Sequence, residues 1–547
     1  MAHYDHDDYS YGPRPPRSRR RTVLGALAAV LVLTAAGFWG YGRLSGDGPE
    51  DPQIAAAQKP LQTFLDAWEA GDAKKAAAVA DTPDTAESLL ESVTGNLKPE
   101  RTEISLGDGE KRSGTDVRFP FTVEMELPGV GDYSWDSQAK VQKKEGNWEV
   151  LFSTPMIHPR MVPGQTLALD PAGDRAAVLD ATGSELEAAS LVGSVDEKTG
   201  KGVAGLEAEY DKQLSGGAKK SVVIVDRANG NTVKTLKKGG GKKGSPVKTT
   251  IDPEVQKAAA EALDGVTKEA AIVAVDPRNG HVLAAANKPG GMNRALAGRY
   301  PPGSTFKVVT AAALLKGGMS PAGRADCPKF SYVDGQRYEN QDQFTLPAGT
   351  TFRESFAKSC NTFFVSSRGK LSSSALHDTA EAFGIGSTWD AGTTTYDGSV
   401  PVNTSDNDKA AATIGQGKVQ ASPLVMASVA ATVKQGEFRQ PVLVPAAAKD
   451  RHKTGASLDD RVLKDLRSMM REAVTTGAAS KLKDAPGETH AKTGTAEFGN
   501  ETPPRTHAWM IGYQGERNVA WAVLLADGGS GGSDAGPVAA DFLENLG

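Results

Sequence analysis

A serine and a lysine three residues apart, Ser304 and Lys307, follow Pro-Pro-Gly in this chain. A serine hydroxyl becomes an effective nucleophile only when a neighbouring base takes its proton. A lysine can be that base if burial or a nearby cation lowers its pKa toward neutrality. Residues three apart share one face of a helix, and the segment after Lys307 is almost entirely apolar. We therefore predict that a buried helix begins at Ser304 and holds this serine beside its base.

The Ser-x-x-Lys spacing also occurs elsewhere, so spacing alone does not identify the nucleophile. One copy lies in an alternating, strand-like segment, and the others lie in a hinge, in a lysine-rich loop or beside charged residues. None of them begins an apolar helix. These rival pairs are Ser137/Lys140, Ser245/Lys248, Ser355/Lys358, Ser367/Lys370 and Ser480/Lys483.

A serine–lysine acyl-transfer site needs two further parts, a Ser/Asn motif and a strand carrying Lys-Thr-Gly that binds a carboxylate. Lys-Thr-Gly begins at Lys198, Lys453 and Lys492, and only the last copy lies in a strand-like segment with strand-like neighbours. Ser-x-Asn occurs at 359–361 and at 405–407, and only the first copy has apolar neighbours that could fix its direction. We predict that Ser359, Asn361 and Lys492 complete the site.

A second serine motif lies near the end of the chain. Residues Gly528–Gly532 match Gly-x-Ser-x-Gly, between a strand-like and a helical segment. In α/β-hydrolases the acid and the histidine follow the serine in the chain. No histidine follows His507, so we interpret this segment as a strand-to-helix turn.

Composition limits the class of protein. At 547 residues the chain is too long for one core, so several domains are expected. A formal charge of −5 argues against a nucleic-acid partner. Two cysteines, Cys327 and Cys360, make neither a disulfide scaffold nor a zinc site. We expect two separate buried thiols, and the alternative is a disulfide joining the loop after the Ser304 helix to the Ser359 motif.

The N-terminal segments indicate a membrane anchor. Residues 1–21 form a polar, arginine-ending tail, which we expect to be disordered and cytoplasmic. Residues 22–41 are uncharged and long enough to span a bilayer as a helix, with arginines before them and aromatic residues near their end. A cleaved signal peptide is the alternative. The segment 42–53 is a linker, and all that follows is expected outside the cytoplasm.

Three regions follow the linker. In 54–157, a helical start precedes strands with period-two alternation, which indicates an α+β domain with one covered sheet face. Residues 158–245 have shorter apolar runs and end in a glycine- and lysine-rich hinge. From 246 to 547 strand-like and helical runs alternate, which predicts a large mixed α/β domain containing every site residue.

With Ser304–Lys307, Ser359–Asn361 and Lys492–Gly494 in this order, the chain resembles the penicillin-binding transpeptidases. Segments such as NRALAGRYPPGSTFK, IGQGKVQASPLVMA and AWMIGY look like family segments in family order over 246–547. Region 158–245 resembles the linker (dimerisation) domain of class B members. Region 54–157 resembles the NTF2-like extension in relatives of the low-affinity staphylococcal penicillin-binding protein. The resemblance implies a serine β-lactamase/transpeptidase-like domain with a central antiparallel sheet.

The resemblance implies acyl transfer from a peptidoglycan stem peptide. Ser304 would attack the carbonyl of the penultimate D-alanine while Lys307 accepts its proton. Ser359 would relay a proton to the departing D-alanine, and Asn361 would hold the substrate amide. An amine from a neighbouring stem would then take the acyl group.

The strand motif would bind the substrate's end. The family pattern implies that Lys492, Thr493, Gly494 and Thr495 hold the terminal carboxylate, and that backbone N–H groups of Ser304 and Thr495 form the oxyanion hole. No metal or organic cofactor is implied. The expected partners are stem peptides, β-lactams, the membrane and a membrane glycosyltransferase of the elongation or division machinery.

Two other functions share these motifs. A serine β-lactamase would hydrolyse its acyl-enzyme, and a β-lactam sensor or wall scaffold would be acylated without productive transfer. Class A lactamases activate water with a glutamate on an E-x-x-L-N type loop between the second and third motifs. None of the glutamates in that interval fits this pattern: Glu381, Glu437, Glu472 and Glu488. The anchor and extra domains also favour the transpeptidase over a lactamase, but they say less against a scaffold.

Overall fold

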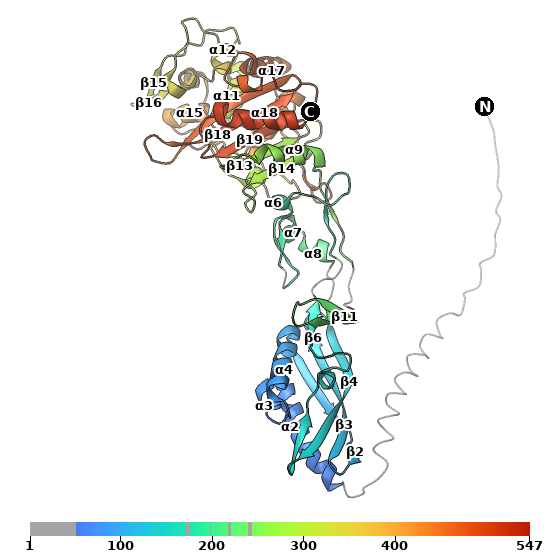
Figure 1. The fold of residues 1–547 in the computed structure, drawn as a ribbon. Coiled ribbons are helices and arrows are strands. Elements are labelled where there is room, and N and C mark those ends of the chain that lie inside the picture. The colour runs from blue at the N-terminus through green and yellow to red at the C-terminus, as the bar shows by residue number, and fades with distance from the viewer. Residues whose placement is uncertain (1–50, 171–174, 197–198, 217–219, 239–242) are drawn as a thin grey trace, which may run out of the picture. The chain divides into compact units, whose positions relative to one another are not determined.

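The structure is a computed structural model that describes residues 51–170, 175–196, 199–216, 220–238 and 243–547 (Figure 1). The predicted tail, the predicted anchor at 22–41 and most of the linker lie outside the described residues. Within the described ranges, no helix is both long enough and apolar enough to cross a bilayer. The chain divides into two compact units, one comprising residues up to Leu127 with Asp132–Thr166, the other Pro128–Gly131 with Leu167–Gly547.

The first unit packs helices on one face of an antiparallel sheet. Strand β3 (Asp116–Leu127) alternates as predicted, and every second residue from Val117 to Leu127 is buried. Strands β4 (Gly131–Lys144) and β5 (Asn147–Leu151) pair as an antiparallel hairpin. The sheet order is β1-β3-β4-β5, with β2 paired to β3. The remaining elements are α2 (Pro52–Glu69), α3 (Ala73–Ala77), α4 (Pro83–Leu97), β1 (Arg101–Leu106), β2 (Glu110–Ser113) and α5 (Thr154–Ile157).

Short elements make up the region predicted as a linker domain. Strands β11, β10 and β6 form one small sheet, β8 pairs with β9, and β7 pairs with β12. Arg175 joins two of its helices by donating to Glu207 and Asp211. The elements are β6 (Gln165–Asp170), β7 (Val178–Leu179), α6 (Ala189–Val192), β8 (Ser194–Val195), β9 (Gly202–Ala204), α7 (Gly205–Glu209), α8 (Asp211–Ser215), β10 (Ser221–Asp226), β11 (Thr232–Lys237) and β12 (Val247–Lys248).

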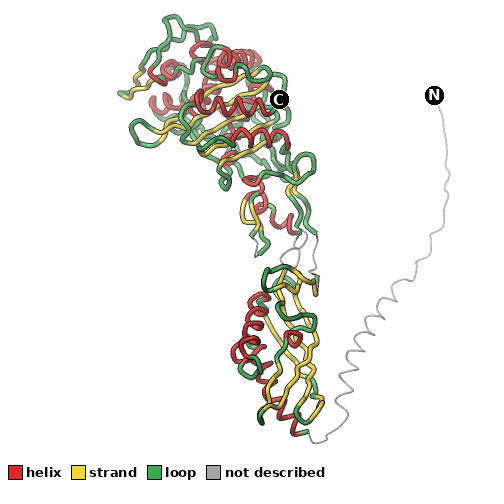
Figure 2. Tube along the Cα trace, viewed as in Figure 1, coloured by secondary structure: helices red, strands yellow, loops and turns green. Residues whose placement is uncertain are grey.

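A five-stranded antiparallel sheet forms the centre of the large domain, in the order β14-β13-β19-β18-β17. This confirms the predicted central antiparallel sheet. Figure 2 shows helices on both sides of its strands. The strands are β13 (Glu269–Val275), β14 (Val282–Lys288), β17 (Thr489–Phe498), β18 (Arg505–Gln514) and β19 (Ala520–Ala526).

Alternation along β13 divides the interior into two cores. Ala270, Ile272 and Ala274 pack on one face with helices α9 (Pro253–Leu263) and α18 (Gly536–Asn545). The residues between them face the other core, which contains α11 (Lys307–Lys316) and α16 (Pro423–Gln435). Because both faces are covered, the strand is apolar at nearly every position.

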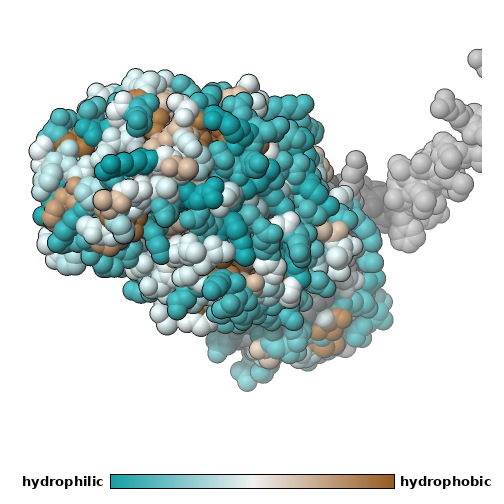
Figure 3. All heavy atoms as spheres, turned by 90° about the horizontal axis from the view of Figure 1, so that it is seen from above, coloured by the Kyte–Doolittle hydropathy of each residue, from teal (hydrophilic) through white to brown (hydrophobic). Residues whose placement is uncertain are grey.

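The surface seen in Figure 3 is mainly hydrophilic, with apolar residues in small separate patches.

The remaining elements of the large domain are α10 (Arg294–Ala297), η1 (Gly303–Phe306), β15 (Phe330–Val333), β16 (Gln336–Glu339), η2 (Gln341–Gln343), α12 (Phe352–Ala357), α13 (Asn361–Ser366), η3 (Ser367–Lys370), α14 (Ala375–Ala382), α15 (Asp406–Thr413), α17 (Asp460–Thr475), η4 (Ser480–Leu482) and the π-turn η5 (Gly531–Ala535).

Candidate active site

Ser304 lies at the entry to a buried helix. The 3-10 turn η1 carries Ser304 and leads directly into α11, which begins at Lys307. Gly303 has φ +53°, and a Cβ there would lie 2.6 Å from the carbonyl oxygen of Thr495. Only glycine fits this close approach, so the turn is held against strand β17. Ser304 is 8% exposed and Lys307 is completely buried.

The Lys307 ammonium group is held by the Ser-x-Asn motif. Its Nζ donates to Asn361 Oδ1 at 2.6 Å and to the carbonyl oxygen of Ser359 at 2.8 Å. Ser304 Oγ donates to the same Asn361 oxygen at 3.4 Å. Nucleophile and base therefore donate to the same amide oxygen. Long catalytic hydrogen bonds in free enzymes often shorten when substrate binds.

Ser359 joins the two buried lysines. Its hydroxyl accepts from Lys492 Nζ at 2.8 Å and from Lys307 Nζ at 3.4 Å. Ser359 has φ +61°, in the left-handed region between α12 and α13. Such strain in a non-glycine residue persists only where the surrounding contacts impose it. The strained turn places one hydroxyl between two ammonium groups.

Burial changes the ionisation of both lysines, and repulsion by Lys492 adds to the effect on Lys307. The pKa of Lys307 lies well below its usual value, first because burial removes the ammonium from water and second because of the nearby charge of Lys492. Burial lowers the pKa of Lys492 to about 7. Lys307 is the group whose uncharged form is favoured, as a base requires.

Strand β17 carries the third motif. Lys492, Thr493 and Gly494 are buried and Thr495 is half-buried. The strand forms the edge of the sheet and pairs only with β18. Lys492 Nζ also donates to Thr493 Oγ1 at 3.4 Å. The structure therefore brings together every residue that the sequence analysis named for the site.

Residues 339 and 340, which sequence analysis missed, hold the Ser-x-Asn motif. Asn340 Oδ1 accepts from the backbone N–H of Asn361 at 2.8 Å. Asn361 Nδ2 donates to the carbonyl oxygen of Glu339 at 2.9 Å. These contacts fix which side of the Asn361 amide faces Lys307. No motif marks the two residues, because their role depends on contacts more than twenty positions away in the chain.

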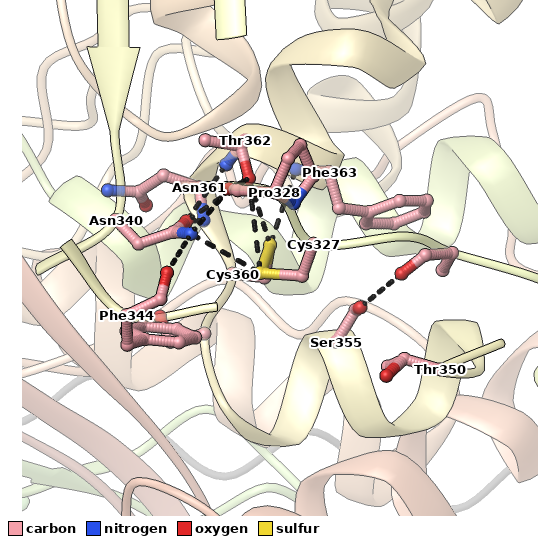
Figure 4. The surroundings of a disulfide bond; sticks show 12 residues. Cys327, Pro328, Asn340, Phe344, Thr350, Ser355, Cys360, Asn361, Thr362 and Phe363 are labelled. Atoms are coloured by element: carbon pink, nitrogen blue, oxygen red, sulfur yellow. Dashed lines mark hydrogen bonds between the residues drawn. A yellow bond between two sulfur atoms is a disulfide. The ribbon is translucent and has the colours of Figure 1, made fainter. Parts of the chain in front are cut away.

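The cysteine prediction was wrong. Cys327 and Cys360 form a disulfide, with their Cα atoms 6.1 Å apart (Figure 4). Cys360 is the middle residue of the Ser-x-Asn motif, so the bridge ties this motif to the segment before β15. Thr362 Oγ1 donates to the carbonyl oxygen of Pro328, the neighbour of Cys327, at 2.6 Å. The hairpin β15–β16 lies between the two cysteines and brings the chain back to α13. The spacing of the cysteines in the sequence does not reveal this path.

The rival motifs lie in other settings. Ser405 caps helix α15 by accepting from the N–H of Asp408. Lys453 lies in an irregular segment, and Lys198 is outside the described residues. Ser355 is buried in α12, where its hydroxyl donates to the carbonyl oxygen of Ala325. At Ser355, Ser405 and Lys453, the described structure shows no contact with a second buried lysine.

Comparisons with known proteins agree with this geometry. Residues 270–544 match the penicillin-binding protein transpeptidase domain, and residues 56–165 match the NTF2-like N-terminal transpeptidase domain. The peptidoglycan D,D-transpeptidase PbpA of Mycolicibacterium smegmatis is 30% identical over 403 residues, covering 61% of this chain and 77% of that protein. PbpA of Mycobacterium tuberculosis is 29% identical over 376 residues, covering 56% and 73%.

Solved structures give the same result. Penicillin-binding protein A from M. tuberculosis, as a ceftriaxone acyl-enzyme complex, has a TM-score of 0.58 at 26% identity and covers 69% of this chain and 99% of its own. Its penicillin G acyl-enzyme complex has a TM-score of 0.56 at 25% identity, with coverage of 69% and 99%. The domain match spans half of the chain and contains all three motifs. This chain belongs to the penicillin-binding protein transpeptidase family.

Proposed function

We propose that this chain cross-links peptidoglycan stem peptides as a D,D-transpeptidase, through an ester on Ser304. The observation that carries the proposal is the pair of completely buried lysines sharing the hydroxyl of Ser359. One of them has a strongly lowered pKa and shares an acceptor with the Ser304 hydroxyl. The names of the relatives, peptidoglycan D,D-transpeptidases, support the choice of substrate.

Acylation begins with proton transfer. Ser304 Oγ attacks the carbonyl carbon of the penultimate D-alanine, and its proton passes to uncharged Lys307. When the tetrahedral intermediate collapses, the peptide C–N bond breaks and the departing D-alanine amine needs a proton. Ser359 gives that proton and regains one from an adjacent lysine, since its hydroxyl contacts both ammonium groups. Positioned acid–base groups of this kind contribute about 10²–10⁴ in rate.

The strand motif binds the substrate's terminal carboxylate. Lys492 in its charged form, with the hydroxyls of Thr493 and Thr495, provides donors for the anion, while Gly494 allows β17 and η1 to approach each other. A Cβ at residue 494 would lie 2.8 Å from the Thr305 side chain. The backbone N–H groups of Ser304 and Thr495 form the oxyanion hole, and losing one such donor typically costs ~10²–10³ in rate.

Transfer completes the reaction. Asn361 orients the acyl chain through its amide, and an amine of a second stem attacks the ester carbon and releases Ser304. A β-lactam also acylates Ser304: the attack opens its ring, and the amine that leaves the carbonyl carbon stays attached to the rest of the molecule. The solved acyl-enzyme complexes of the M. tuberculosis relative support this mode of inhibition.

The cellular setting is part of the proposal. Residues 22–41 anchor the chain in the membrane, with the catalytic domain on the extracytoplasmic side. Residues 158–245 serve as a linker domain between the NTF2-like and transpeptidase domains. A membrane glycosyltransferase of the elongation or division machinery supplies the glycan strands to be joined.

Labelling with a fluorescent penicillin tests the proposal. The full-length protein is expected to form one adduct, on Ser304, that persists for minutes to hours, and to transfer a stem-peptide acyl group to an added amine. Hydrolysis of penicillin many times per second would replace the transpeptidase with a β-lactamase. A stable adduct with no transfer would indicate a sensor or scaffold.

A further inference from the structure

The Gly528–Gly532 loop, set aside above as a turn, lies against the carboxylate-binding strand. The backbone N–H of Gly531 donates to Thr495 Oγ1 at 3.2 Å. A Cβ at residue 531 would lie 2.3 Å from the carbonyl oxygen of Gly494 and 2.5 Å from that of Trp509. The loop therefore packs directly on the Lys-Thr-Gly segment, and glycine is required at 531.

The same loop also contacts the segment that holds the Ser-x-Asn motif. Ser530 Oγ accepts from Gln341 Nε2 at 3.0 Å. Gln341 follows Asn340, which holds the backbone of Asn361 (Figure 4). The loop is fixed by Thr506 Oγ1, which donates to the carbonyl oxygen of Gly529 at 2.9 Å. Half-buried Ser530 thus lies between the strand motif and the segment that supports the Ser-x-Asn motif.

Three hydroxyls share one hydrogen-bonding pattern here. Thr493 accepts from Lys492, Thr495 accepts from Gly531, and Ser530 accepts from Gln341. Among the described residues, none of these three hydroxyls donates to a protein acceptor. Because a hydroxyl has one proton and two lone pairs, an N–H on a lone pair leaves the proton available. Hydroxyl protons left available in this way suit an anionic ligand.

We propose that Ser530 is a third hydroxyl of the carboxylate subsite and determines specificity for substrates with a free terminal carboxylate. Gln341 is a positioning residue, which acts by holding the Ser530 hydroxyl. The inference rests on the proposed function, because the carboxylate subsite is defined by the donor of that reaction. It adds to the Lys-Thr-Gly motif a residue contributed by the chain after β19.

The experiment compares acylation by benzylpenicillin with acylation by its methyl ester, which lacks the carboxylate. Ser530→Ala should lower the preference for the free acid about tenfold, the size expected for one hydrogen bond to a charged group. Ser530→Thr keeps the hydroxyl and should keep most of the preference. The matched control is Ser533→Ala, an exposed serine in the π-turn that follows Ser530, which should leave the preference unchanged.

Gln341→Ala tests the positioning role. It should lower the preference in the same direction by a smaller factor, and should add nothing once Ser530 is alanine, because both changes remove one interaction. An unchanged preference in Ser530→Ala, or equal slowing with acid and ester, would overturn the inference. If the wild-type chain forms no Ser304 adduct with either compound, the proposed function fails and this inference fails with it.

Discussion

Ser-x-x-Lys occurs in regular structure in both units of the molecule, and the copy in the first unit behaves differently from Ser304 and Lys307. In the NTF2-like unit, Ser137 and Lys140 lie on strand β4. Ser137 Oγ donates to the carbonyl oxygen of Met156 at 2.7 Å, while Lys140, 40% exposed, pairs with Asp116 at 3.1 Å. In the transpeptidase unit, Ser304 and Lys307 share an acceptor in a buried helical entry.

The difference follows from secondary structure. Residues three apart on a strand point to opposite faces, whereas on a helical segment they share a face. On β4 the serine therefore faces the core and the lysine faces solvent. At the junction of η1 and α11 both groups face the interior, where the charge of Lys492 helps to keep Lys307 uncharged. Reactivity depends on which element carries the motif and on what that element packs against.

The largest expected effect contrasts the two serines. Ser304→Ala should abolish covalent labelling by fluorescent penicillin, because the attacking oxygen is gone. Ser137→Ala should label at the wild-type rate and lose only about 1 kcal/mol of stability, the usual contribution of one buried hydrogen bond. Gel fluorescence measures labelling, and urea unfolding measures stability. Labelling of the Ser304 variant would refute the assignment of the nucleophile.

The next largest expected effect is on the acylation rate and contrasts Lys307 with Lys140. Lys307→Met should slow acylation about 10²–10⁴-fold, the range for loss of a general base. Lys140→Met removes an exposed ion pair and should change stability by about 1 kcal/mol or less, with acylation unchanged. Stopped-flow acylation kinetics measure both variants. Equal, small effects in the two variants would remove the basis of the comparison.

The charge of Lys492 predicts a pH dependence. With a pKa of about 7, Lys492 loses its charge as pH rises, so the acylation rate constant for a carboxylate-bearing β-lactam should fall above about pH 7. The rate should also fall on the acid side, because Lys307 must be uncharged. In Lys492→Gln the alkaline limb should disappear.

The same variant also predicts a shift of the acid limb. Without the Lys492 charge the pKa of Lys307 rises, since that repulsion helps to lower it, and the acid limb should move to higher pH. Overall acylation should be slower than in the wild type, because one carboxylate donor is gone. A pH profile of the same shape as the wild type would contradict the role given to Lys492.

The last expected effect concerns stability, in which the disulfide should distinguish the two units. Both cysteines of the chain lie in the transpeptidase unit, 33 residues apart. Reduction should therefore destabilise that unit by about 2–4 kcal/mol and leave the NTF2-like unit unchanged. Domain-resolved thermal unfolding with and without reductant measures this. Without reductant, alkylation should find no free thiol; two alkylated cysteines would contradict the bridge.

The motif residues could be selected from the sequence because their signals are local, whereas the central antiparallel sheet was implied by the resemblance to the transpeptidases. The apolar run after Lys307 and the strand-like segment around Lys492 can be read within about fifteen residues. The contacts of Asn340 and Ser530 could not be predicted in this way, because each depends on a partner brought close by the tertiary fold. The disulfide was missed for the same reason. Local sequence pattern therefore predicts which helix or strand a residue belongs to, whereas its tertiary contacts depend on the path of the chain.

The position of β13 in the sheet has a consequence for biosynthesis. Strand β13 pairs along its length with β19, so that Val275 lies opposite Ala520. Such non-local pairing makes folding slow, since a long loop must close before its contacts repay the lost entropy. While the chain is being synthesised, Ser304 exists long before Lys492 does. Ribosome-bound chains that lack β17–β19 should therefore be inert toward penicillin, and the nucleophile becomes reactive only when the last strands join the sheet.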